Sequence, residues 1–317
     1  LMLTTLPTIS LLLTVLASSW IIKRLGARRT TLIGLIIALL AGLVPVFIND
    51  YVIVFISRLL LGVGVGLFNN LAYSLIMAVY EGEERQTMLG FQSAVGTVGN
   101  ALASFVVGLL ISNGWQVAFN VNWLFVIPLV LFGLFATKID QFTNPVVTET
   151  GDTVPIKAKE TTNMAVVGYV LLIATFFAFY FGLLLKLAGF LVEQHLGTAA
   201  VAATQLSVMS LIGLLPSLLY GQIYKHLRRL TIPIGLIITG LGIGIIATAG
   251  TLTMTWIGIV ISGFGLPIVM PAIFGKVAEV QPEGSSNLSS ALMLVGINVA
   301  VFLSPQVLAV TTQIDRK

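Results

Sequence analysis

Ten apolar stretches, each about as long as a bilayer is thick, occupy most of this 317-residue chain. They lie near residues 3–22, 30–48, 51–80, 87–111, 117–137, 164–191, 200–224, 231–250, 254–277 and 285–311. A helix of roughly 20 residues spans the hydrocarbon core, whereas a barrel strand needs about half that length and alternates in polarity. The pattern therefore predicts an all-α transmembrane protein.

The composition supports a membrane protein and excludes several other classes. Hydrophobic residues make up 57% of the chain and charged residues only 9%, whereas a soluble domain carries about a quarter charged residues. The net charge of +4 comes from residues in the connections, so we expect the lipid bilayer as a partner and no nucleic acid. With no cysteine there is no thiolate metal site, and we expect no metal and no cofactor.

Positive charge is confined to alternate connections. Twelve of the 16 Lys and Arg residues lie in them, and the opposite connections 49–50, 112–116 and 251–253 contain none. Cytoplasmic loops carry an excess of Lys and Arg. We therefore expect a multi-pass protein of a cell membrane, a bacterial plasma membrane, with connections 23–29, 138–163 and 225–229 in the cytoplasm.

The connection 138–163 is long and polar, which predicts a flexible cytoplasmic linker between two halves, 1–137 and 164–317. A short basic hairpin follows the first apolar stretch of the first half and the second stretch of the second half. If the halves are duplicates of six helices each, the chain is a fragment that holds the second to sixth and the seventh to eleventh helices. Duplicated membrane bundles are typical of transporters.

Several motifs resemble those of the major facilitator superfamily over essentially the whole chain. The superfamily has G-x-x-x-D-R-x-G-R-R after its second helix, and this chain has Ser19 through Arg29 there. The positions that correspond to this motif, with their second-half counterparts, are Lys23, Arg24, Gly26, Arg28, Arg29, Gly221, Lys225, Arg228 and Arg229. Lys23 stands where the superfamily has its aspartate, and the second copy also lacks an acid. Trp115 and Phe119 resemble the W-R-x-x-F sequence at the start of the sixth helix.

The resemblance implies two pseudo-symmetric helical bundles that transport a small solute by alternating access. It also implies that the basic motif residues form a cytoplasmic gate, with Glu81, Glu83 and Glu84 as candidate partners. The alternative is that these cations only determine topology. Proton coupling in this superfamily commonly uses a membrane-embedded carboxylate, yet no acid lies deep in any apolar stretch.

Small residues mark two of the apolar stretches. After Arg58, as in the superfamily's fourth helix, come Gly62, Gly64 and Gly66, and the stretch 87–111 holds Gly96, Gly99 and Asn100. Small residues let membrane helices approach closely. We expect helix packing at these positions, or a hinge in the stretch 87–111.

Two cations lie inside apolar sequence. A charge there is costly and usually faces a cavity, so we expect Arg58 and Lys186 to line a substrate cavity. Asn69 is eleven residues after Arg58 and returns to the same helix face. Lys186 has a long side chain that alternatively allows it to snorkel to the outer interface.

These observations predict a monomeric secondary transporter for a small molecule, coupled to protons. Efflux of drugs or metabolites is the first choice, because the helices are mostly apolar with sparse polar groups. Uptake of an organic anion, based on Arg58 and Lys186, is the alternative. A membrane-embedded enzyme or scramblase is a remote one: the two histidines, His195 and His226, fall on opposite sides of the membrane, and we assign no catalytic residues.

Overall fold

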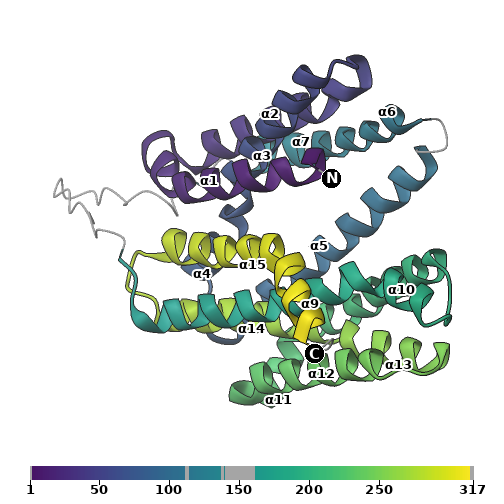
Figure 1. Cartoon of the computed structure of the whole chain (residues 1–317). Helices are drawn as coiled ribbons and strands as arrows, with labels where there is room; N and C mark the ends of the chain where they lie inside the picture. The colour runs from purple at the N-terminus through teal and green to yellow at the C-terminus, as the bar shows by residue number, and fades with distance from the viewer. Residues whose placement is uncertain (1, 111–113, 137–138, 140–160, 315–317) are drawn as a thin grey trace. The chain divides into compact units, whose positions relative to one another are not determined.

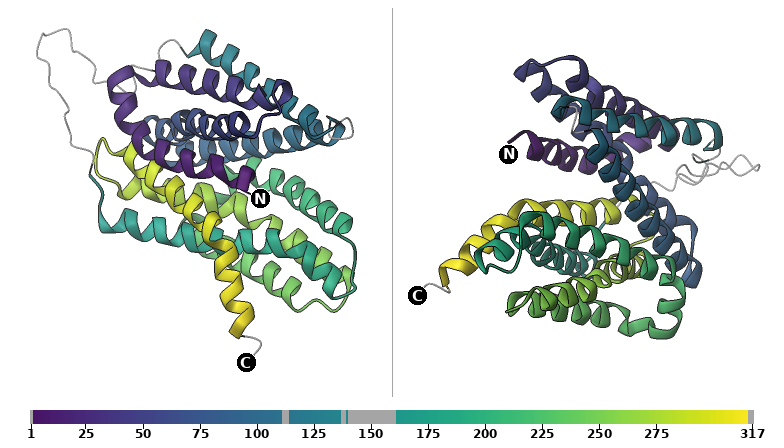
Figure 2. Two further views of the ribbon diagram at one scale, coloured as in Figure 1. Left: turned by 45° about the horizontal axis from the view of Figure 1, so that its top comes forward. Right: turned by 90° about the vertical axis from the view of Figure 1, so that its right-hand side faces the viewer.

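Every secondary-structure element in this computed structural model is a helix over the described residues 2–110, 114–136, 139 and 161–314 (Figures 1 and 2). The elements before the linker are α1 (Met2–Leu25), α2 (Ala27–Phe47), α3 (Tyr51–Asn69), α4 (Leu71–Val79), α5 (Gly82–Leu110), α6 (Trp115–Ala118), η2 (Phe119–Phe125) and α7 (Val126–Phe135). Those after it are α9 (Met164–Glu193), α10 (Ala199–Leu218), α11 (Tyr220–Leu227), η3 (Arg228–Leu230), α12 (Thr231–Ala247), α13 (Leu252–Gly263), α14 (Gly265–Val280) and α15 (Ser286–Ile314). The prediction of an all-α membrane fold is confirmed.

Helices follow the predicted apolar stretches, with breaks inside some of them. Within the described residues, eight helical spans are long and apolar enough to cross a membrane. Breaks at Asn70, Leu219 and Phe264 divide three of the predicted stretches into two helices each. The linker prediction for 138–163 falls almost entirely outside the described residues.

Side-chain caps begin three helices, α3, α10 and α13, each of which follows a short connection. Asp50 accepts a hydrogen bond from the Ile53 backbone N at 3.0 Å and so begins α3. Thr198 accepts one from Val201 at the start of α10, and Thr251 accepts one from Met254 at the start of α13. Each cap satisfies one of the backbone N–H groups that a helix leaves without a partner in its first turn.

The contacts divide the chain into two compact units. The first contains 1–79, 102–166 and 280–295, and the second contains 80–101, 167–279 and 296–317. The units differ from the predicted halves 1–137 and 164–317, because the first part of α5 packs with α10 and α11 and the start of α15 bonds to Asn70. The division into two bundles stays a prediction.

The core of the first unit is built by α3, which packs against both α1 and α2. A Cβ placed on Gly34 of α2 would lie 2.7 Å from the Gly64 carbonyl oxygen, and one on Gly64 would lie 2.7 Å from the Gly34 oxygen. The backbones therefore touch where the helices cross, at a distance that any side chain would prevent.

The second unit repeats this crossing between α12 and α13. Here the facing residues are Gly242 and Gly258, and a Cβ on either would again lie 2.7 Å from the other's carbonyl oxygen. Helix α13 also packs against α10, as α3 does against α1. The same three-helix arrangement, with one helix before the hairpin and two after it, therefore accompanies each basic hairpin.

Candidate functional site

Arg58 lies in the first unit on α3, with its side chain only 6% exposed. Its Nη2 donates to the Ala41 carbonyl oxygen at 3.3 Å and to the Gly42 oxygen at 3.2 Å, both on α2. The guanidinium carbon lies 4.6 Å from the centre of the Phe119 ring, within the range of a cation–π contact. The cation is thus held by backbone carbonyls and an aromatic face.

The other two predicted cavity residues lie elsewhere. Asn69 ends α3 and is half-buried, and the next residue, Asn70, is completely buried and donates to the Asn287 carbonyl oxygen at 2.9 Å. Lys186 lies on α9 in the second unit, with an exposed side chain. Arg58 and Asn69 belong to the first unit and Lys186 to the second, and their role in a substrate cavity stays a prediction.

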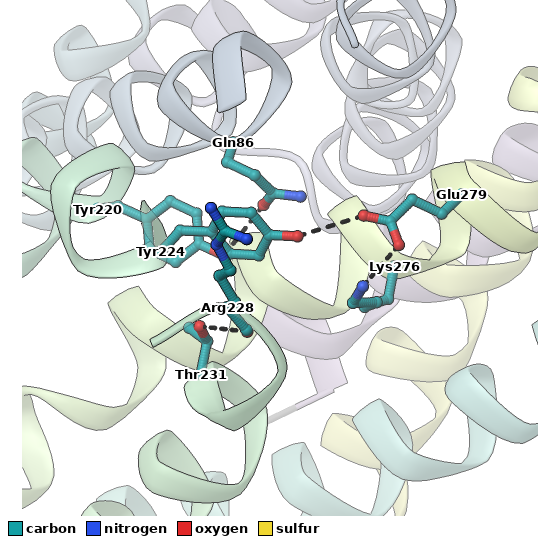
Figure 3. Close-up of polar contacts among 7 residues, drawn as sticks. All are labelled: Gln86, Tyr220, Tyr224, Arg228, Thr231, Lys276 and Glu279. Carbon is teal, nitrogen blue, oxygen red and sulfur yellow. Dashed lines mark hydrogen bonds and ion pairs between the residues drawn. The ribbon is translucent and has the colours of Figure 1, made fainter. Parts of the chain in front are cut away.

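The second unit holds a buried polar contact that we call the α5 seam, of which Figure 3 shows Gln86 and Tyr220. It joins Gln86, Thr87, Gly90 and Ser93 of α5 to Ser217 of α10, Tyr220 and Gly221 of α11, and Gly275 of α14. The Tyr220 hydroxyl donates to Gln86 Oε1 at 3.0 Å, and the two side chains are 0% and 1% exposed. The hydroxyls of Ser93 and Ser217 lie 3.3 Å apart.

Glycines allow the helices of the seam to approach closely. A Cβ on Gly90 would lie 2.7 Å from the Ser217 carbonyl oxygen and from Tyr220 Cβ. A Cβ on Gly221 would collide with the Thr87 side chain, and one on Gly275 would collide with the Gln86 carboxamide. Gly221 is the first glycine of the second basic motif, so its small size has a direct packing explanation.

A charged cluster lies next to the seam on α11 and α14. Glu279 Oε2 accepts from Lys276 Nζ at 2.6 Å, and its Oε1 accepts from the Tyr224 hydroxyl at 3.3 Å (Figure 3). Arg228 has a positive φ of 44°, and its carbonyl oxygen accepts from the Thr231 hydroxyl at 2.8 Å. The second basic hairpin therefore turns sharply at Arg228, beside the helix that carries Tyr220.

The first basic hairpin turns at Gly26, whose φ of 83° favours glycine. Arg24 stacks on Trp20, with its guanidinium carbon 4.1 Å from the ring centre. Arg28 Nη2 donates to the Gly133 carbonyl oxygen on α7 at 2.9 Å, which ties the hairpin to a later helix of the same unit. Arg29 is exposed, and the Lys23 side chain lies outside the described residues.

The described part of the second hairpin is more exposed. Lys225, Arg228 and Arg229 all have exposed side chains. A gating role for either hairpin, including a pairing with Glu81, Glu83 or Glu84, stays a prediction.

The predicted packing residues differ from one another in their surroundings. Gly62 and Gly66 face α1, where a Cβ on Gly62 would collide with Ser10 and one on Gly66 would lie 2.7 Å from Thr14 Cβ. Gly96 and Gly99 are exposed, and no atom of the described residues lies within 4 Å of a Cβ placed on either. Asn100 is also exposed, so this part of α5 makes no close glycine contact in the described structure.

Sequence reasoning did not identify Gln86 and Tyr220 of the seam. It also did not identify Asn122, a buried residue of η2 that donates to the Gly42 carbonyl oxygen at 3.0 Å. A signal was present for two of them: Gln86 and Asn122 are amides at or inside apolar stretches, where an unsatisfied polar group is expensive. Their partners are 134 and 80 residues away in the chain. Spacing in the sequence cannot predict such pairings.

Comparison with solved structures supports the fold. The proton:xylose symporter XylE bound to 6-bromo-6-deoxy-D-glucose matches with a TM-score of 0.72 and 16% identity, over 99% of this chain and 79% of that one. The human organic anion transporter MFSD10 (TETRAN) matches with a TM-score of 0.75 and 14% identity, over 96% and 76%. A bacterial homologue of the iron transporter ferroportin, in an outward-facing state, matches with a TM-score of 0.70 and 14% identity, over 96% and 81%.

Sequence comparison gives the family. Over 110 residues, 34% of this chain, the sequence is 32% identical to the methylenomycin A resistance protein of Bacillus subtilis (strain 168), and the match spans 23% of that relative's length. The sequence model of the Major Facilitator Superfamily, a family of membrane transporters and not of enzymes, matches residues 1–305. The chain therefore belongs to the major facilitator superfamily.

Proposed function

We propose that this chain forms the membrane-embedded part of a secondary transporter that exports small drug-like or metabolite molecules in exchange for protons. The family match over residues 1–305 supports transport and is the observation that carries the proposal. The match to a resistance protein over a third of the chain favours export of an antibiotic-like solute. We also propose a bacterial plasma membrane as its location, which the partial match to a protein of Bacillus subtilis supports. The basic connections support a multi-pass orientation with these connections in the cytoplasm.

Uptake of an organic anion is the second candidate, and it depends on the two intramembrane cations. Lys186 is exposed, and Arg58 donates to two backbone carbonyls and stacks on an aromatic ring. These contacts give Arg58 a function that requires no anionic solute. They therefore favour export of neutral or cationic molecules over anion uptake.

The α5 seam suggests how the transporter moves. By the charge pattern, the first turns of α5 and the hairpin 225–229 lie on the cytoplasmic side, and the seam joins α5 to the helices beside that hairpin. In alternating access, one helical repeat moves against the other around a fixed site. We propose that the seam parts when the binding site opens to the cytoplasm and closes when the site opens outward.

The test is drug susceptibility in an efflux-deficient bacterial host that expresses the full-length protein. Growth inhibition is measured against a panel of neutral, cationic and anionic antibiotics, with the empty vector as control. The proposal expects at least one neutral or cationic compound to become several-fold less inhibitory, and a protonophore to abolish this protection. Unchanged susceptibility together with faster accumulation of labelled organic anions would support the uptake alternative instead.

A further inference from the structure

Pro45 lies inside α2, two residues before that helix ends at Phe47. In an unbroken helix the backbone N–H of residue 45 would donate to the Ala41 carbonyl oxygen, but proline has no N–H. Helix α2 lies within an apolar span suited to the membrane, where no bulk water can replace the missing donor. A carbonyl oxygen without a partner there costs several kcal/mol.

Two side chains from other elements donate to this part of α2. Arg58 Nη2 reaches both the Ala41 oxygen at 3.3 Å and the Gly42 oxygen at 3.2 Å. Asn122 Nδ2, from η2, donates to the same Gly42 oxygen at 3.0 Å. Both donors are buried.

The residue at position 42 makes room for these donors. A Cβ on Gly42 would lie 2.5 Å from Asn122 Cγ, so any side chain there would displace the carboxamide. Asn122 also donates to the Phe119 carbonyl oxygen three residues earlier, at 2.8 Å. Phe119 in turn carries the ring on which the Arg58 guanidinium stacks. Gly42, Pro45, Arg58, Phe119 and Asn122 thus form one connected arrangement within the first unit.

We propose that Arg58 is a positioning residue: it gives the Ala41 carbonyl oxygen the hydrogen bond that Pro45 removes from α2. Together with Asn122, which donates to the next carbonyl oxygen, it fixes the outer end of α2 against α3 and η2. A guanidinium suits this task, because it presents several donors in a fixed plane and also stacks on an aromatic ring. Pro45 and Arg58 are then one functional pair, although they lie on different helices. The proposal does not depend on the direction of transport or on the substrate.

The experiment is a double-mutant cycle in the full-length protein, with Pro45→Ala, Arg58→Met and the double variant. Pro45→Ala returns the N–H to α2, and Arg58→Met removes the donors but keeps an extended side chain. Melting temperatures in detergent are compared with those of the parent. Pro271→Ala, which changes a proline inside α14 of the second unit, is the matched control.

The expected result is that Arg58→Met lowers the melting temperature several degrees less in the Pro45→Ala background than in the parent. In the Pro271→Ala background its effect is unchanged, because distant sites with no shared partner are additive. Equal effects of Arg58→Met in the parent and Pro45→Ala backgrounds would overturn the proposal. If the Arg58→Met protein cannot be produced in folded form, the same cycle is run with Arg58→Lys, which keeps the charge and loses the planar guanidinium. Its effect on the melting temperature is again compared between the parent and the Pro45→Ala background.

A second readout separates positioning from general stability. A spin label at Phe47→Cys, which is exposed at the end of α2, reports the motion of this end. The proposal expects Arg58→Met to increase the label's mobility and Pro45→Ala in the same chain to reduce it again. No change in mobility, in a variant that is folded, contradicts the proposal.

Discussion

Tyr220 and Gln86 are polar side chains that are almost completely buried, and they form a hydrogen bond with each other. The phenol donates to the carboxamide oxygen at 3.0 Å, and Gly275 leaves the space that the carboxamide occupies. A buried polar group without a partner costs more than a satisfied hydrogen bond contributes. The loss of folding free energy on breaking this hydrogen bond should therefore depend on whether a buried polar group remains without a partner.

Tyr220→Phe should destabilise the protein by about 1–3 kcal/mol, because it leaves Gln86 Oε1 buried without this donor. Adding Gln86→Leu should recover part of the loss, since then neither partner remains unsatisfied. Thermal unfolding in detergent measures both. Tyr51→Phe, at an exposed tyrosine, is the control, and a Tyr220→Phe effect no larger than that of Tyr51→Phe would contradict this assignment.

Gly64 faces backbone atoms, which cannot rotate away as a side chain can. A Cβ on this residue would lie 2.6 Å from the Ala38 nitrogen as well as 2.7 Å from the Gly34 oxygen. Gly64→Ala should therefore force α2 and α3 apart and cost about 1–3 kcal/mol, the usual range for overpacking.

Gly96→Ala is the matched control, because nothing among the described residues lies near that position. Alanine favours a helix more than glycine does, so this change should leave the melting temperature equal or slightly higher. A loss of stability as large as that of Gly64→Ala would show that Gly96 makes a close contact after all.

At the scale of elements, the helices could be predicted and their interruptions could not. Apolar length is a local property of the sequence, so the spans follow directly from it. Proline disfavours a helix interior, yet Pro45, Pro216 and Pro271 all lie inside helices. The breaks fall instead at Asn70, Leu219 and Phe264.

The physical reason is that a proline interrupts a helix only if the lost hydrogen bond is not replaced. Arg58 replaces it at Pro45 by donating to the Ala41 carbonyl oxygen, and Arg58 lies on another helix. The break at Asn70 likewise involves a distant partner, the Asn287 carbonyl oxygen. Such partners depend on tertiary structure, which no local pattern contains.

The candidate site was predicted only in part for the same reason. Basic hairpins and intramembrane cations are visible in the sequence because charge is rare there. The α5 seam consists of serine, glutamine, tyrosine and glycine, which are common residues, and only their arrangement distinguishes them. Gly221 was noted as part of a motif, but its contact with Thr87 was not.

At the scale of the whole molecule, the charge pattern predicts which connections share a side of the membrane. The chain has no cysteine, so single cysteines can report this directly. Asn49→Cys should react with a membrane-impermeant maleimide in intact cells. Asp152→Cys, at a position outside the described residues, should react only after the cells are permeabilised. Labelling of position 152 in intact cells would refute the assigned orientation.

The central proposal is that the full-length protein transports its solute by opening and closing the α5 seam. Ser93→Cys and Ser217→Cys can test it together, because the two serine hydroxyls lie 3.3 Å apart. Cysteine sulfurs in their place are close enough for small side-chain rotations to bring them to the length of a disulfide bond. Flux of an identified substrate is measured in proteoliposomes of the full-length protein before oxidation, after oxidation and after reduction. The two single-cysteine variants serve as controls. We expect oxidation to stop flux only in the double variant and reduction to restore it, whereas full flux through completely crosslinked protein would contradict the account.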